Sequence, residues 1–268
     1  MVDLEDNLVI TPISRDNLTR YASFLSEVFG REHLNPEYLD WLYFQNPTGA
    51  VVGFDAFLDG QLVGHYACVP IIIDVYDLPA LLSLNTAVAE EFQGRGLFKL
   101  LALKTYVFAE EKFSCVVGVA NKKSFRGFVR HLGFTHLGEL ELRLGNLDRP
   151  VLGQRVYSLE EISWRTRNPS GELKIMHSAE SGRVVLIKVV GRYFKLKSIV
   201  RISNLNRPLS NLGPRRAFGL SVDWRSYTSP KLFLPKKFKP APLHLIFKPL
   251  KESECLLTSW SFPDFDVL

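Results

Sequence analysis

The sequence predicts a mixed α/β (α+β) fold built around a central sheet, and three observations support this prediction. A short apolar run leads through a glycine-rich turn into a helix at Ser83 to Gly96. Asp59-Gly60 separates two apolar runs, which is the strongest short signal for a β-hairpin. Apolar residues repeat with helical spacing before and after these strands. Together these signals give the order β-α-α-β-β-β-α-β-α-β over residues 1–145.

Each element has its own local signal. Caps and glycine stops indicate helices at Ser14 to about Phe29, from Asn35-Pro36-Glu37 onward, at Leu97 to about Lys112, and at Ser124 to Leu132 before Gly133. Apolar or alternating runs between turn residues predict strands at Leu8 to Ile13, Val51 to Leu58, Leu62 to Ile73, Leu81 to Val88, Phe113 to Ala120 and Phe134 to Leu144.

The stretch from Ser83 to Gly96 carries the main functional signal. Its strand is followed by Glu90-Glu91 and then by Gln93-Gly94-Arg95-Gly96, which opens the helix at Leu97. The first N–H groups of a helix lack intrahelical partners and carry partial positive charge, and glycines let a phosphate approach them. The stretch therefore indicates a pyrophosphate site, with a plain tight connection as the alternative. Neither G-x-x-x-x-G-K-[ST] nor G-x-G-x-x-G is present.

Two patterns surround this turn. The first reads T-A-V-A-E-E-F-Q-G-R-G-L-F from Thr86 to Phe98, and the second reads N-x-x-S-x-x-x-F-x-x-x-x-G-F from Asn121 to Phe134. They resemble the two signatures of the GNAT superfamily of acyl-CoA N-acyltransferases, which are Q/R-x-x-G-x-G/A after a strand and N-x-x-A-x-x-x-Y-x-x-x-x-G-F. Phe98 stands where Gly or Ala is usual. The resemblance covers roughly residues 1–145.

The resemblance implies a GNAT fold with a central mixed sheet. It also implies direct acyl transfer from an acyl-CoA, expected to be acetyl-CoA, to a primary amine through a ternary complex. The backbone N–H of Val88 would stabilise the tetrahedral oxyanion. The CoA site would consist of Ala87, Val88, Asn121 and Ser124 around the pantetheine arm, and of Gln93, Gly94, Arg95, Gly96, Leu97 and Phe98 around the pyrophosphate. A cap for the following helix is the alternative role of Asn121.

The catalytic acid and base stay open at this point. Phe128 stands where many family members have a Tyr that protonates the departing thiolate, and phenylalanine cannot donate a proton. A thiol pKa of roughly 8.5 makes the thiolate a tolerable leaving group without help, and Tyr106 or water are alternative donors. His65 is the candidate general base, with a structural strand histidine as the alternative. Asn85, together with Ser83, is a candidate for orienting the amine.

Charge is spread unevenly along the chain. Residues 1–150 hold 13 Lys+Arg and 19 Asp+Glu, whereas residues 151–268 hold 20 and 9. The asymmetry predicts two units, the second of which faces an anion, with a solvated basic surface as the alternative. Nucleic acid is not the expected partner, because the arginines are scattered and the aromatic residues form no stacking series.

An internal echo predicts the domain organisation. Asn168-Pro169-Ser170-Gly171 repeats Asn46-Pro47-Thr48-Gly49, and each is followed at the same distance by a second turn signal, Ser181-Gly182 or Asp59-Gly60. We expect a GNAT domain at residues 1–145, a linker at 146–153, and a second, degenerate GNAT-like domain without the phosphate turn at 154–268. The alternative is a chance repeat in an unrelated β-rich domain.

Composition indicates the compartment. Cys68, Cys115 and Cys255 lie far apart without a C-x-x-C, which is neither a disulfide framework nor a metal site and suits a reducing cytosol. The acidic N-terminus lacks the apolar core of a signal peptide. The most apolar stretch, Val69 to Val75, is too short for a bilayer. A cytoplasmic protein with no metal and no membrane span is expected.

The acceptor is expected to be the amino group of a nucleotide-linked deoxysugar. The predicted tandem organisation, the segment W-L-Y-F-Q-N-P-T-G and the closing S-F-P-D-F-D-V-L are similar to acyltransferases of surface-polysaccharide pathways. The basic second half would then face the diphosphate. The alternatives are a peptide or small-molecule amine such as an aminoglycoside, and a non-catalytic acyl-CoA or polyanion-binding module. The sequence is compatible with an oligomer.

Overall fold

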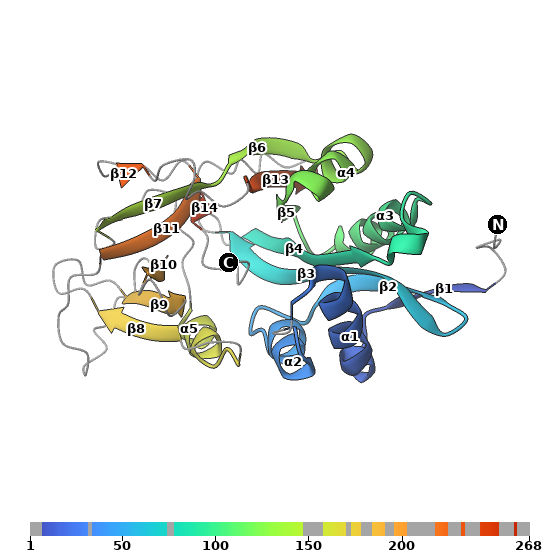
Figure 1. The fold of residues 1–268 in the computed structure, drawn as a ribbon, viewed down its shortest axis with the longest axis horizontal. Coiled ribbons are helices and arrows are strands. Elements are labelled where there is room, and N and C mark those ends of the chain that lie inside the picture. The colour runs from blue at the N-terminus through green and yellow to red at the C-terminus, as the bar shows by residue number, and fades with distance from the viewer. Residues whose placement is uncertain are drawn as a thin grey trace. The chain divides into compact units, whose positions relative to one another are not determined.

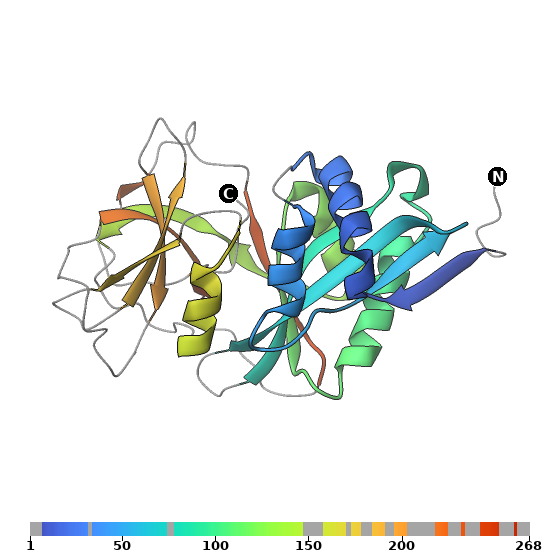
Figure 2. The same ribbon diagram turned by 90° about the horizontal axis from the view of Figure 1, so that it is seen from below.

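The computed structural model describes residues 7–31, 34–73, 78–146, 158–169, 173–177, 184–190, 196–202, 218–224, 232–233, 242–251 and 260–261. The chain divides into two compact units, drawn in Figure 1 and Figure 2. Residues 1–72, 79–136 and 246–255 form the first unit, and residues 73–78, 137–245 and 256–268 form the second.

The first unit contains a mixed sheet, as the sequence predicted, and it has seven strands where six were expected. The strands lie in the order β1 (Leu8–Pro12), β2 (Val52–Leu58), β3 (Gln61–Ile73), β4 (Leu78–Val88), β5 (Cys115–Ala120), β13 (His244–Pro249) and β6 (Thr135–Glu139). β1 and β3 are antiparallel to β2, whereas β4 and β5 are parallel. The hairpin between β2 and β3 is confirmed at Asp59 and Gly60, whose φ angles of 50° and 77° suit a two-residue turn.

Helices cover both faces of this sheet (Figure 1). α1 (Leu18–Phe29) and α2 (Pro36–Phe44) lie on one face, and α3 (Leu97–Ala109) and α4 (Lys122–Leu132) lie on the other. The predicted caps are present. Asn35 accepts a hydrogen bond from the N–H of Tyr38, and Gly30 and Gly133 end α1 and α4 in the left-handed conformation. Ser14 caps a short 3-10 turn, η1 (Arg15–Asn17), which precedes α1.

The main core lies between the sheet and the α3–α4 pair. Its buried side chains come from strands and helices alike, and include Phe54, Tyr66, Leu81, Leu97, Leu101, Tyr106, Val116, Phe128, Phe134 and Ile246. Alternate residues of β2 and β3 point to opposite faces, so the α1–α2 face receives a different set. That set includes Asp55 and His65, which are direct partners in the antiparallel register.

The predicted strand from Phe134 to Leu144 was wrong in one respect. The structure has two strands there, β6 and β7 (Glu141–Asn146), and they belong to different sheets. The break lies at Leu140, whose backbone N–H donates to the carbonyl of Leu243 at 2.8 Å. Apolar and polar residues alternate from Leu140 to Leu144, and Gly138, with a φ of 154°, lies two residues before the break. A single glycine also occurs inside continuous strands, so the local pattern does not show that the chain changes sheet.

β13 comes from far along the chain and lies between β5 and β6. The N–H of Leu250 donates to the carbonyl of Ser114, so the end of β13 lies beside the start of β5 and the two strands run antiparallel. Residues 154–268 were predicted to form a second domain, whereas β13, which lies within them, belongs to the sheet of the first unit.

The second unit also contains a sheet. Its path is β12 (Leu232–Phe233), β7, β11 (Phe218–Trp224), β10 (Leu196–Ile202), β9 (Val184–Val190) and β8 (Leu173–His177), and β14 (Trp260–Ser261) pairs with β11. A capping box at Ser158 starts its helix, α5 (Leu159–Thr166). The succession α5-β8-β9-β10 parallels α2-β2-β3-β4, and β10–β11 is parallel like β4–β5.

The second, degenerate GNAT-like domain stays a prediction. Of the echo that suggested it, Asn168 is buried directly after α5, while Ser170-Gly171 and Ser181-Gly182 lie outside the described residues. Most of the expected linker, residues 147–153, also lies outside them. No helix among the described residues is long and apolar enough to cross a membrane.

Candidate functional site

The cleft begins where β4 and β5 separate. The two strands pair in parallel from Ala80 opposite Cys115 to Ser83 opposite Gly118, whereas β4 continues to Val88. Asn85 has a φ of 46°, a left-handed conformation that is uncommon for a non-glycine residue and bends the strand just beyond the last pair. The parallel pairing therefore stops inside the sheet, and the diverging strand ends open one wall of a cleft.

The glycine-rich turn forms a second wall. β4 is followed by the 3-10 turn η2 (Glu90–Phe92), and then Gly94 and Gly96 adopt φ angles of 76° and 82°. A Cβ atom built on either glycine would meet no heavy atom within 4 Å, so open space lies beside both. Gly96 is the N-cap of α3, and the unpaired N–H groups of the first helical turn begin directly after it.

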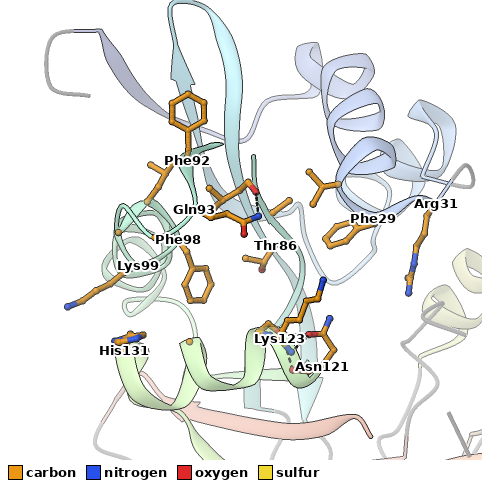
Figure 3. A pocket seen from close by; sticks show the side chains of 18 residues that line it. Phe29, Arg31, Thr86, Phe92, Gln93, Phe98, Lys99, Asn121, Lys123 and His131 are labelled. Atoms are coloured by element: carbon orange, nitrogen blue, oxygen red, sulfur yellow. Dashed lines mark hydrogen bonds between the residues drawn. The ribbon is translucent and has the colours of Figure 1, made fainter. Parts of the chain in front are cut away.

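These walls enclose a cavity of about 820 Å³ (Figure 3). Every described residue that lines it belongs to the first unit. They come from the end of α1, the end of β4, the turn, the start of α3 and α4: Val28, Phe29, Arg31, Thr86, Ala87, Val88, Phe92, Gln93, Gly94, Gly96, Leu97, Phe98, Lys99, Asn121, Lys123, Ser124, Gly127 and His131.

Most of the residues predicted to bind CoA line this cavity. Ala87, Val88, Gln93, Gly94, Gly96, Leu97, Phe98, Asn121 and Ser124 all do. Arg95 is not among the lining residues, and its guanidinium instead lies 5.4 Å from the centre of the Phe92 ring. The side chain of Gln93 donates from Nε2 to the carbonyl of Val88 at 3.1 Å, which ties the turn to the end of β4.

Asn121 has the capping role that the sequence analysis gave as its alternative. Its Oδ1 accepts hydrogen bonds from the N–H groups of Lys123 and Ser124 at 2.9 and 3.0 Å. Capping uses the oxygen alone, so the Nδ2 group is still available as a donor at the cavity wall. The two roles of Asn121 are therefore compatible.

His65 lies outside the cavity lining and is fully buried. Its Nδ1 lies 2.6 Å from Oδ1 of Asp55, and its Nε2 lies 3.0 Å from the hydroxyl of Tyr43. Both ring nitrogens are thus occupied within the protein. Direct proton abstraction from a substrate by His65, as the sequence analysis considered, does not fit this placement, although the residue is linked to Asn85 through Tyr43.

Phe128, at the position of the usual family acid, and the alternative donor Tyr106 both lie outside the cavity lining. Phe128 is buried, with its ring 5.1 Å from those of Phe98 and Phe134 in edge-to-face arrangements. The hydroxyl of Tyr106 lies 2.6 Å from that of Tyr66, and burial raises the pKa of both groups well above their ordinary value. Neither Tyr106 nor Phe128 lines the cavity, so neither faces a departing thiolate there.

The sequence analysis missed one polar group in the cavity wall. Thr86 lies between Asn85 and Ala87 on the diverging end of β4, and its Oγ1 is buried without a hydrogen-bond partner (Figure 3). A buried hydroxyl without a partner is destabilising, which fits a position that a bound ligand would complete. Its place in the first signature was visible, but only the side-chain environment singles it out.

Basic side chains at the cavity were missed as well. Arg31, Lys99, Lys123 and His131 line it, from the end of α1 and from α3 and α4. Such groups complement the N-termini of α3 and α4 in attracting an anion. The run Lys122-Lys123 directly after Asn121 was the one sequence signal for them. Among the described residues, no group of three or more His, Cys, Asp or Glu side chains is placed to hold a metal ion.

Comparison with known proteins places the fold. No protein-family model matches the chain, and no curated protein matches it in sequence. A probable N-acyltransferase from Enterococcus faecalis V583, itself of unknown function, aligns with 10% identity over 91% of this chain and 73% of its own, with a TM-score of 0.58. A putative acetyltransferase from Pyrococcus horikoshii aligns with 9% identity over 70% and 72%, with a TM-score of 0.50. A GNAT family N-acetyltransferase from Escherichia coli, in complex with CoA, aligns with 20% identity over 48% and 69%, with a TM-score of 0.41.

The likeness to the Enterococcus faecalis structure extends over parts of both units, because it covers 91% of the chain. At 10% identity it is a likeness of fold. The chain therefore shares its fold with the Enterococcus faecalis and Pyrococcus horikoshii structures.

Proposed function

We propose that the protein is an acyl-CoA-dependent N-acyltransferase that moves an acyl group, in the first instance acetyl, to a primary amine. The observation that carries this proposal is the cavity of about 820 Å³ between the diverging end of β4 and the N-termini of α3 and α4. Its walls combine open backbone at Gly94 and Gly96 with cationic side chains. That combination suits the diphosphate and pantetheine arm of CoA.

The diphosphate is held by the turn and the start of α3. The unpaired N–H groups after Gly96 donate to its oxygens, and the helix dipole adds partial positive charge. Gly94 and Gly96 have no Cβ that would block the approach. Lys99 and Lys123 add full charges at the same cavity.

The reaction itself needs little from side chains. The lone pair of the neutral amine attacks the thioester carbonyl carbon, and the carbonyl oxygen becomes an oxyanion near the backbone N–H of Val88. One such donor contributes roughly 2.7–4 kcal/mol to transition-state stabilisation. The intermediate then collapses, the C–S bond breaks, and the thiolate leaves while the proton of the nitrogen passes to solvent. With a thiol pKa of roughly 8.5, this departure needs no tyrosine acid.

The acceptor we propose is the amino group of a nucleotide-linked amino sugar. It is supported by the charge of residues 151–268, which hold 20 Lys+Arg and 9 Asp+Glu and would complement a nucleotide diphosphate. A cationic amine such as an aminoglycoside would instead favour the acidic first half, with 13 Lys+Arg and 19 Asp+Glu. The chemistry at the thioester is the same for either acceptor.

The test is a thiol-release assay with acetyl-CoA and longer acyl-CoAs against UDP- and dTDP-amino sugars, aminoglycosides and peptide N-termini. Turnover with the amino-sugar nucleotides supports the full proposal, and turnover with another amine supports acyl transfer but replaces the acceptor. Binding of CoA without turnover of any amine contradicts the enzyme and favours a binding module. The Arg95→Ala variant is a useful control, because Arg95 lies on Phe92 rather than in the cavity wall and its loss should change turnover by less than about threefold.

A further inference from the structure

We infer that the carboxamide of Asn85 positions the attacking amine, and that a buried chain of hydrogen bonds through Tyr43, His65 and Asp55 fixes its orientation. The inference rests on the proposed acyl transfer, because the amine is the substrate of that reaction. Asn85 is the residue that touches substrate. The other three are positioning residues on α2, β3 and β2.

The chain of hydrogen bonds has one direction. Nδ2 of Asn85 donates to the hydroxyl oxygen of Tyr43 at 3.0 Å. The proton of that hydroxyl is then free to point to Nε2 of His65 at 3.0 Å, where the unprotonated nitrogen accepts it. In the tautomer that fits this arrangement, Nδ1 carries the proton and donates it to Oδ1 of Asp55 at 2.6 Å. From Asp55 to Asn85, each group thus determines whether the next one donates or accepts its hydrogen bond.

At the Asp55 end of this series of hydrogen bonds, the groups make further hydrogen bonds within the protein. Oδ2 of Asp55 accepts from the hydroxyl of Tyr21 at 2.5 Å, and that hydroxyl accepts from the N–H of Ser14 at 2.9 Å. Tyr21, Tyr43, Asp55 and His65 are each 0% exposed. Burial raises the pKa of Tyr43, so its hydroxyl keeps its proton. Satisfied buried networks of this kind are rigid, because an alternative arrangement would leave a polar group without a partner.

At the other end of this series, the carboxamide oxygen of Asn85 is available to accept a hydrogen bond. Nδ2 of Asn85 points inward to Tyr43, so Oδ1 points away from it, and Asn85 makes no other hydrogen bond to the described residues. Asn85 is half-buried rather than buried, and its Oδ1 is not among the enclosed polar atoms that lack a partner. An amide oxygen in this situation accepts a hydrogen bond from an N–H donor.

Asn85 lies next to the cavity lining rather than in it, so the amine would reach it from the edge of the cavity. Asn85 directly precedes Thr86 to Val88, which line the cavity and include the N–H proposed for the oxyanion. A strand rises about 3.3 Å per residue, so three residues place Asn85 within roughly 10 Å of Val88 along the chain. An amine that donates one N–H to Asn85 has that bond direction fixed, which restricts the direction of its lone pair toward the carbonyl carbon.

The backbone at Asn85 separates two possible roles of the residue. Its φ of 46° is a left-handed conformation that glycine adopts without strain and asparagine tolerates. Glycine would therefore satisfy the bend in β4 on its own. The carboxamide is what asparagine adds, and the hydrogen bond to Tyr43 holds it.

The test uses Asn85→Gly, which keeps the bend and removes the carboxamide. The matched control is Asp59→Gly, because Asp59 also has a positive φ, of 50°, but lies in the exposed hairpin turn. The assay follows thiol release from acetyl-CoA with an amino-sugar nucleotide and with methylamine, which offers an N–H donor and no other polar group. For Asn85→Gly we expect kcat/KM for the amine to fall about 10- to 100-fold, while the Kd of CoA stays within about twofold. Asp59→Gly should match the wild type in both.

A double-mutant cycle separates positioning from a structural role. Tyr43→Phe keeps the ring and removes the hydroxyl that holds Asn85, and we expect roughly a 3- to 10-fold fall in kcat/KM for the amine. In Tyr43→Phe/Asn85→Gly the loss should be no larger than in Asn85→Gly alone, because Tyr43 acts through Asn85. Melting temperatures of all variants identify any loss that comes from unfolding.

The outcomes distinguish this inference from the proposed function. If the wild type acylates an amine and Asn85→Gly does so with unchanged kcat/KM, the role of Asn85 is overturned while acyl transfer stands. Additive losses in the double mutant overturn the chain through Tyr43 but leave Asn85. If the wild type binds CoA and acylates neither methylamine nor any other amine, the proposed function fails and this inference fails with it.

Discussion

The two faces of the first sheet differ in whether their polar groups find hydrogen-bond partners within the protein. On the α1–α2 face, Asp55, His65, Tyr43 and Tyr21 are fully buried and bonded to one another. On the α3–α4 face, the core is mostly apolar apart from the hydroxyls of Tyr66, Tyr106 and Ser83, which bond to one another. A cavity opens at the edge of this face, where Thr86 has no partner. One face holds its polar groups satisfied within the protein, and the other leaves backbone and side-chain groups unsatisfied at its rim.

This difference suggests that the two faces on either side of β4 would serve different parts of the proposed reaction. Binding a diphosphate and a pantetheine arm requires open main-chain donors, which the α3–α4 face supplies without many specific side chains. Aiming a small amine requires a group whose direction is fixed, and a closed hydrogen-bond network provides that. β4 contributes to both, since Asn85 faces Tyr43 and Thr86 lines the cavity.

The largest effect we predict is on the closed face. In Asp55→Ala, His65 and Tyr21 lose a buried charged partner, and we expect the free energy of unfolding to fall by about 3–5 kcal/mol. Urea unfolding followed by circular dichroism measures it. The control is Asp59→Ala in the exposed hairpin turn, where the loss should come from the left-handed φ of 50° and from the exposed hydrogen bond that Asp59 accepts from Asn7, and stay at about 1–2 kcal/mol. Equal losses in the two variants would mean that the buried network is not a source of stability.

The next largest effect is expected on the open face. Gly96→Trp places a large side chain beside the first turn of α3, and we expect CoA affinity to fall by at least about 100-fold, or roughly 2.7 kcal/mol. Gly60→Trp is the matched control. Gly60 has a φ of 77°, close to the 82° of Gly96, and both have open space within 4 Å, so backbone strain is equal and only the location differs. Calorimetric titration with CoA gives both affinities, and equal losses would place the nucleotide elsewhere.

Local signals predicted most of the first unit. Asp59-Gly60 indicated the hairpin, Asn35 the start of α2, and Gly133 the end of α4, because each acts through its neighbours in sequence. The place of β13 in the sheet could not be predicted from such local signals. Its residues read as a strand, but nothing within His244–Pro249 indicates that it inserts between β5 and β6, more than a hundred residues earlier in the chain. The change of sheet at Leu140 has the same cause.

The same distinction between local and long-range signals applies to the residues of the site. The turn and its glycines were predictable because Gln93 to Phe98 are contiguous and their chemistry is that of the backbone. The partners of His65 were not, since Tyr43 and Asp55 are separated from it by 22 and 10 residues and meet it only through α2 and the register of β2 with β3. The free hydroxyl of Thr86 likewise depends on packing that no local pattern encodes.

A smaller effect is expected at the position where the family usually has tyrosine. Phe128→Tyr adds a hydroxyl to a ring packed against Phe98 and Phe134 rather than against the cavity. We expect no increase in kcat, and a loss of stability of about 1 kcal/mol from placing a polar group in this core. Thiol-release kinetics and thermal unfolding measure the two quantities. A rise in kcat of tenfold or more would show that the hydroxyl reaches the departing sulfur, and the ring would then have to face the cavity. Phe128→Leu, which adds no donor, is the control for the effect of repacking.

The smallest effect we predict belongs to an exposed ion pair on the closed face, and it contrasts with the buried pair of Asp55 and His65. Asp40 on α2 accepts from Arg15 at 2.6 and 2.8 Å, and the hydrogen bonds from Arg15 hold the pKa of Asp40 below its ordinary value. A carboxyl group whose pKa is lower in the folded state stabilises the fold above its unfolded pKa of about 3.9, and this contribution is lost as the pH falls through the folded pKa. Asp40→Asn should therefore lower the Tm at pH 7 by about 1–2 °C, and wild type and variant should converge as the pH falls below the folded-state pKa of Asp40. The difference should also shrink in 1 M salt, since the pair is accessible to solvent.

A difference that persists at acid pH and high salt would assign the effect to the hydrogen bond from Gln45 rather than to the charge. Glu27→Gln, on the exposed side of α1, serves as the control for removing one negative charge.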